Sequence, residues 1–153
     1  MNKEKIKAFM VGVLTVILLM FSLWYAFENQ AKNVNFDRKS KLYTTLVSCE
    51  EKEIDLKEYT SFSWDCLYGF SSCELSLLEQ KIKNVPSFIK EENAPLMVFM
   101  KDGRVACAVI GGEGTMNLEI EGEWECFDSK DDSVFNLKKE NNGKITTIIL
   151  SSH

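Results

Sequence analysis

Histidine and arginine are scarce in this chain of 153 residues, and the scarcity of histidine removes several kinds of catalytic site. The one histidine, His153, is the last residue of the sequence. A nucleophilic serine or cysteine needs a base beside it, so no catalytic triad is indicated. Arginine is rare and lysine is common, which by itself indicates no mechanism. No two cysteines have the C-x-x-C spacing, which removes the thioredoxin-like motif and the zinc knuckle.

Charge is absent from residues 8–27, AFMVGVLTVILLMFSLWYAF. A helix of this length spans about 30 Å, the thickness of the hydrocarbon core of a bilayer. A cleaved signal peptide has a shorter apolar core, of about 7–15 residues, and small residues before the cut. Here the bulky Trp24 stands where a cut after Ala26 would need a small residue. Residues 8–27 are therefore predicted to be an uncleaved transmembrane helix whose partner is the lipid bilayer.

The lysines near this helix predict its orientation. Basic groups before and after the helix are equal in number: the terminal amine, Lys3, Lys5 and Lys7, against Lys32, Arg38, Lys39 and Lys41. The first group lies directly against the helix, and carrying it across a membrane is costly. We therefore expect a cytoplasmic tail (1–7), a transmembrane helix (8–27), a linker (28–40) and an extracytoplasmic domain (41–153). This describes a single-pass membrane protein of a bacterial envelope.

The part of the chain after Phe27 is acidic, with 15 basic and 22 acidic residues and a net charge of −7. An acidic surface repels phosphate backbones and anionic headgroups, so a nucleic-acid partner is not expected. The length fits one domain. Neither a cofactor motif nor a metal-ligand motif is present, so the predicted cofactors are none.

Periodicity predicts helices and strands in this domain. Leu42, Leu46 and Cys49 have helical spacing, and a helix over 72–84 begins with a Ser71–Glu74 capping box and ends before Pro86. Strands are expected over 53–56, 62–70, 96–100, 104–110, 118–120, 124–126, 134–137 and 145–150. Asp102-Gly103 and Asn142-Gly143 are strong hairpin signals. The sum is an α+β fold with one or two helices and an antiparallel β-meander.

Aromatic residues alternate along 62–70, and this stretch carries a resemblance. An aromatic residue, Trp-Asp and an apolar-Tyr-x-Phe run follow one another at Phe62, Trp64, Asp65, Tyr68 and Phe70. The stretch resembles one in small exported or lipid-anchored bacterial proteins of unknown function, in which Pro-Tyr and a helix come next. Here Ser71-Ser72-Cys73 replaces Pro-Tyr. The resemblance implies a small envelope α+β domain and no particular activity.

Three functions remain open at this point. The favoured one is a non-enzymatic interaction domain with an envelope protein as partner, because no nucleophile–base pair is present. The others are an inhibitor or immunity-type protein, and an enzyme with a cleft around Asp65. The five aromatic-motif residues are predicted to be structural, with the side chains of Trp64 and Tyr68 packed on one face of a strand.

Five cysteines leave at least one without a partner in the chain: Cys49, Cys66, Cys73, Cys107 and Cys126. Cys107 falls in the second strand of the Asp-Gly hairpin and Cys126 in the strand region after Gly122; antiparallel strands close in sequence usually lie side by side, so this pair is the first choice for a disulfide. Cys66 and Cys73 compete as a pair, although Cys66 is also expected to be a buried thiol beside Trp64.

Overall fold

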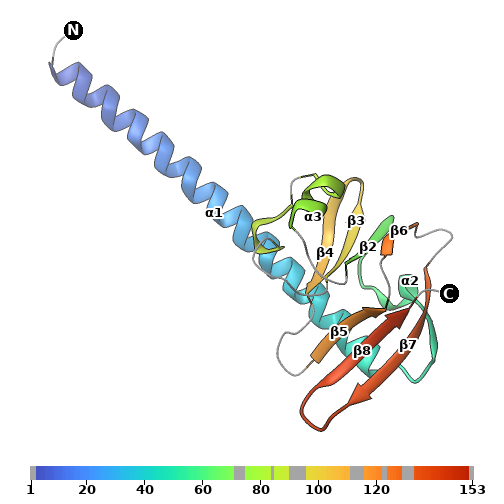
Figure 1. Cartoon of the computed structure of the whole chain (residues 1–153). Helices are drawn as coiled ribbons and strands as arrows, with labels where there is room; N and C mark the ends of the chain where they lie inside the picture. The colour runs from blue at the N-terminus through green and yellow to red at the C-terminus, as the bar shows by residue number, and fades with distance from the viewer. Residues whose placement is uncertain are drawn as a thin grey trace. The chain divides into compact units, whose positions relative to one another are not determined.

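The computed structural model describes residues 3–70, 75–83, 85–89, 96–110, 116–121, 124–128 and 133–151 (Figure 1). The chain divides into two compact units, Met1–Val34 and Asn35–His153, and we call the second the α+β domain. The elements are α1 (Lys3–Ser48), β1 (Glu53–Asp55), α2 (Leu56–Tyr59), β2 (Cys66–Phe70), α3 (Leu75–Lys81), η1 (Ser87–Ile89), β3 (Leu96–Lys101), β4 (Arg104–Ile110), β5 (Met116–Glu121), β6 (Trp124–Asp128), β7 (Val134–Asn141) and β8 (Thr146–Ser151). The predicted α+β class is confirmed.

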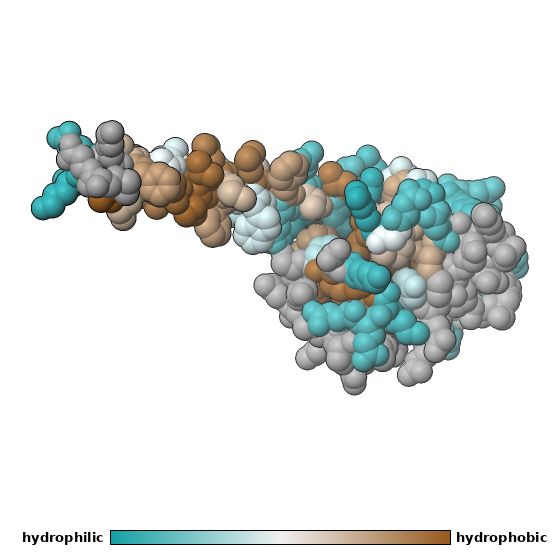
Figure 2. All heavy atoms as spheres, turned by 90° about the horizontal axis from the view of Figure 1, so that it is seen from above, coloured by the Kyte–Doolittle hydropathy of each residue, from teal (hydrophilic) through white to brown (hydrophobic). Residues whose placement is uncertain are grey.

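The first unit consists of the N-terminal part of α1. It is long and apolar enough to cross a membrane, and none of its apolar window is buried against protein. Its hydrophobic side chains lie on the surface, as Figure 2 shows, and large ones such as Phe9, Leu18 and Trp24 are more than half exposed. Exposed apolar surface of this extent is costly in water and favourable in lipid.

The predicted linker over residues 28–40 is helical throughout and continues α1. Its last residues belong to the α+β domain. The side-chain amide of Asn35 accepts from the Ala108 N–H (2.7 Å) and donates to the Ala108 carbonyl (3.0 Å). Arg38 Nη1 donates to the Ala106 carbonyl, and the Tyr43 hydroxyl donates to that of Ile110 (3.4 Å). α1 thus covers the outer edge of β4 and occupies backbone groups that a foreign strand could pair with.

Two four-stranded sheets form the domain. Sheet A has the order β1-β7-β8-β5 and sheet B the order β4-β3-β2-β6. The predicted single antiparallel meander differs from this, since β5 and β8 run parallel. The consecutive strands β5 and β6 exist as expected but belong to different sheets. Both predicted hairpins are confirmed: Asp102 and Gly103 have positive φ (49° and 72°) between β3 and β4, and Gly143 (84°) lies between β7 and β8.

The main core lies between the two sheets and the end of α1. Its fully buried side chains include Leu46 of α1, Phe99 of β3, Phe135 of β7 and Ile148 of β8. The predicted helical stripe is confirmed here, because Leu42, Leu46 and Cys49 are all buried. The Lys139 ammonium of β7 donates to the carbonyls of Val47 (2.7 Å) and Cys49, and so neutralises the C-terminal end of the α1 dipole.

A second core lies on the other face of sheet B. There Leu78 and Ile82, in and after α3, and Ile89 of η1 pack with Val98 and Ala108. The predicted helix over 72–84 is present as α3, while its capping box at Ser71–Glu74 lies outside the described residues.

Candidate functional site

The aromatic motif is divided between the two cores. β2 begins at Cys66 and not at Phe62, so the alternation along residues 62–65 does not belong to the strand. The Trp64 ring lies in the main core, 5.5 Å from the Phe99 ring in an edge-to-face arrangement. Tyr68 packs against the second core and stacks on Phe70 (6.4 Å). The prediction that Trp64 is buried is confirmed, and the prediction that it shares a face with Tyr68 is wrong.

Asp65 holds the turn between β3 and β4. Its Oδ1 accepts from Lys101 Nζ (2.5 Å), and its Oδ2 accepts from the Asp102 N–H (2.8 Å). The Asp65 N–H donates to the Met100 carbonyl (2.8 Å). The bond to Asp65 raises the pKa of Lys101 above its ordinary value. The Asp65 side chain is 48 % exposed, which is a turn-stabilising position and not the enclosed cleft that a general acid would need.

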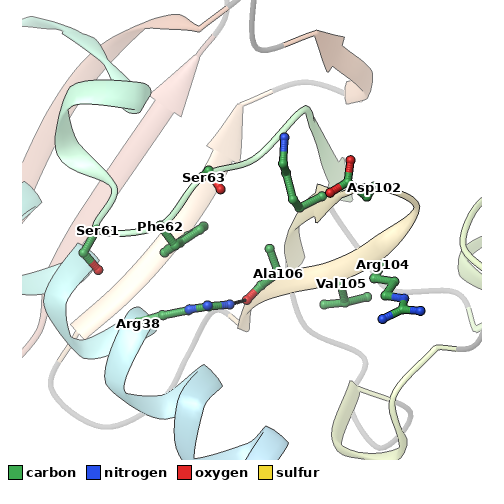
Figure 3. A pocket seen from close by; sticks show the side chains of 9 residues that line it. Arg38, Ser61, Phe62, Ser63, Asp102, Arg104, Val105 and Ala106 are labelled. Carbon is green, nitrogen blue, oxygen red and sulfur yellow. Dashed lines mark hydrogen bonds between the residues drawn. The ribbon is translucent and has the colours of Figure 1, made fainter.

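A pocket of the α+β domain lies beside this turn (Figure 3). Its volume is about 500 Å³, and it is open to solvent. Three segments that are distant in sequence form its walls: α1, the loop before β2 and the β3–β4 hairpin. The lining residues are Arg38, Ser61, Phe62, Ser63, Lys101, Asp102, Arg104, Val105 and Ala106. We call it the arginine pocket.

Arg38 is held in the wall of this pocket by two contacts. Its guanidinium lies over the Phe62 ring, 5.4 Å from the ring centroid, and bonds the Ala106 carbonyl (Figure 3). Phe62 is fixed in turn by the Phe99 ring, 5.3 Å away. Arg104, at the start of β4, is exposed and has no ion-pair partner among the described residues. The pocket therefore combines a guanidinium that is held in place, that of Arg38, with an exposed one, that of Arg104.

The cysteines do not pair as predicted. Cys107 is a free, fully buried thiol, so the predicted Cys107–Cys126 disulfide is absent. Burial raises the pKa of the Cys107 thiol to about 12, which keeps it protonated and unreactive. Cys49 is also free and buried. Cys66 is disulfide-bonded, which contradicts the expected free thiol; the side chains of Cys73 and Cys126 lie outside the described residues.

Tyr59 joins one of these thiols to a carboxylate. Its hydroxyl donates to Glu51 Oε2 (3.0 Å) and accepts from the Cys49 thiol (3.5 Å). These bonds raise the pKa of Tyr59 above its ordinary value, with Cys49 as the larger cause. Among the described residues no three potential metal ligands gather in one place.

Comparison with protein-family models, with curated proteins and with solved structures gave no match. The resemblance of residues 54–70 to exported bacterial proteins therefore stays a prediction. So do the envelope partner and the inhibitor alternative.

Sequence reasoning missed Arg38 and Arg104 as pocket residues, since they are 66 positions apart and belong to no motif. The one available signal was their rarity. Lysine accounts for 16 of the 18 basic side chains, and the two arginines of the chain are the two in this pocket.

Proposed function

We propose that this chain is a single-pass membrane protein that presents the α+β domain outside the cytoplasm as a non-enzymatic binding module. The observation that supports the membrane anchor most strongly is the uncharged stretch of residues 8–27, which is helical and has none of its apolar window buried against protein. Such a helix satisfies its own backbone and is stable in lipid.

The extracytoplasmic side is supported by two features. Lys3, Lys5 and Lys7 lie against the start of the apolar stretch, which favours retention of the N-terminus in the cytoplasm. The disulfide at Cys66 is of the kind that forms and persists in oxidising compartments. A domain on the cytoplasmic side would be expected to keep this thiol reduced.

The binding role is supported by how the reactive groups are used. Asp65 is engaged by the β3–β4 turn, and Cys107 is buried with a raised pKa. The arginine pocket is lined by charged and hydroxyl side chains at an open surface. Recognition through fixed donors needs no nucleophile and no base.

Membrane insertion can be tested by extraction of the full chain with alkaline carbonate. The parent protein should stay in the membrane pellet. Leu14→Asp combined with Leu18→Asp alters two exposed positions, and each charge costs about 3 kcal/mol at the centre of a membrane helix, so this variant should move to the soluble fraction. Leu14→Ile combined with Leu18→Ile is the matched control and should stay in the pellet. Release of the parent protein by carbonate would refute the anchor.

A further inference from the structure

The two arginines of this chain carry an inference about the ligand. Lysine occupies 16 of the 18 basic positions of the chain. A lysine is sufficient wherever a position requires only positive charge. Arginine differs from lysine in its planar fork of five donors, which matches the oxygens of phosphate and carboxylate groups in pairs. Both guanidinium side chains line one pocket, although 66 positions separate them in the sequence.

Arg38 is preorganised for such an interaction. The Phe62 ring and the Ala106 carbonyl hold its half-buried guanidinium in place (Figure 3). One donor is used by Ala106, and the others have no partner among the described residues. A side chain fixed in advance loses little conformational entropy when a ligand binds.

The remaining charges of the pocket favour an anion. Lys101 and Arg104 add two positive charges, against the Asp102 carboxylate in the lining. Asp65 pairs with Lys101 without lining the pocket, so Arg38 and Arg104 are the cations left for a ligand. The pocket is thus locally basic in a domain whose net charge is negative. An anion is therefore attracted to the pocket and repelled by the rest of the surface.

We infer that the arginine pocket binds a phosphate group. Two guanidinium groups and the exposed hydroxyls of Ser61 and Ser63 are more donors than the two oxygens of a carboxylate can use. A phosphate has enough oxygens to accept from both guanidinium groups and from a hydroxyl. The volume, about 500 Å³, suits a small phosphate-bearing molecule or the phosphate of a larger envelope component. This inference rests on the proposed binding function and names its ligand class.

The test uses the full chain in alkyl maltoside micelles, which contain no phosphate. Inorganic phosphate and glycerophosphoglycerol, the diester headgroup of phosphatidylglycerol, are titrated by calorimetry at constant ionic strength. We expect saturable binding of at least one probe with one site per chain. A diester that binds more tightly than inorganic phosphate would assign the pocket to a lipid headgroup or phosphodiester polymer, and the reverse order to free phosphate; both orders support the inference.

Variants at exposed positions separate the pocket from general charge. Arg104→Ala should weaken binding by about tenfold or more, because it removes a charged hydrogen-bond donor, and Arg104→Lys should weaken it less. Lys144→Ala makes the same change of charge in the β7–β8 turn and should leave binding unchanged. Unaltered circular dichroism establishes that each variant is folded.

Two results would overturn the inference: no saturable binding of either probe by the parent, or equal weakening by Arg104→Ala and Lys144→Ala. Neither result bears on the side of the membrane, which is measured separately by surface labelling. Failure of the ligand class is thereby distinguished from failure of the proposed function.

Discussion

At the scale of single residues, Trp64 joins the loop before β2 to the main core. Its side chain is 5 % exposed, its ring meets Phe99 edge to face, and its Nε1–H donates to the Thr60 hydroxyl (3.2 Å). A buried indole thus has both its apolar surface and its one donor satisfied. The same loop carries Phe62, so the position of Trp64 also determines the wall of the arginine pocket.

Trp64→Ala should lower the free energy of unfolding of the domain by about 3–5 kcal/mol, as large aromatic truncations in cores do. Urea unfolding followed by circular dichroism measures this. Trp64→Phe keeps most of the apolar contact and should cost less. A melting temperature of Trp64→Ala within one or two degrees of the parent value would show that the ring contributes little to the core.

The thiols give a second prediction at this scale. In native protein Cys49 and Cys107 should resist iodoacetamide, because both are buried and burial raises the pKa of Cys107 to about 12. After denaturation without reduction, mass spectrometry should find both alkylated and Cys66 unmodified. Alkylation of Cys66 without prior reduction would contradict the disulfide and remove one support for the extracytoplasmic side.

At the scale of elements, the C-terminal part of α1 covers the edge strand β4 of the domain. Through Asn35, Arg38 and Tyr43 it engages three carbonyls along the free edge of β4. Edge strands with unpaired backbone groups invite association with other chains, and a covering helix prevents this. The helix that begins as the apolar stretch therefore ends as part of the globular fold.

Asn35→Ala tests this cover. The variant loses both hydrogen bonds to Ala108, so the part-buried N–H and carbonyl of Ala108 have no side-chain partner. The free energy of unfolding should therefore fall by about 1–3 kcal/mol. Asn33→Ala lies two residues earlier on an exposed position of the same helix and should be neutral or slightly stabilising, since alanine favours helix. Equal changes in the free energy of unfolding for the two substitutions would show that the Asn35 hydrogen bonds do not stabilise the domain.

Local patterns predicted the elements well where periodicity and turn chemistry agree. The helical stripe at Leu42 and Leu46 and the two glycine hairpins are present as expected. The segment 28–40 is helical although its polar, asparagine-rich sequence has weak helix propensity, because contacts of its last residues with β4 override that propensity. The strand at 62–70 was drawn too long because alternation cannot distinguish a strand from the extended loop before it.

Long-range arrangement could not be predicted in this way. Nothing local indicates that β5 pairs with β8 in parallel while β6 joins the other sheet. The arginine pocket has the same origin, since it forms only when α1 reaches the β3–β4 hairpin. The only sign of this pocket in the sequence is the rarity of arginine, and that rarity does not show that the two arginines lie close together.

At the scale of the whole molecule, two parts of the chain have surfaces of different chemistry. Residues 8–27 are uncharged and exposed, whereas the part after Phe27 carries a net charge of −7 and buries two hydrophobic cores. The first surface favours lipid and the second favours water. The proposed anchored domain follows from this division.

The most direct test of the proposed topology is surface labelling with a membrane-impermeant maleimide in intact bacterial cells. Lys144→Cys places a thiol in the exposed β7–β8 turn and Lys3→Cys places one before the apolar stretch, with the parent chain as background. We predict that Lys144→Cys is labelled in intact cells and that Lys3→Cys is labelled only after lysis. Labelling of Lys3→Cys in intact cells, with Lys144→Cys protected until lysis, would contradict the account.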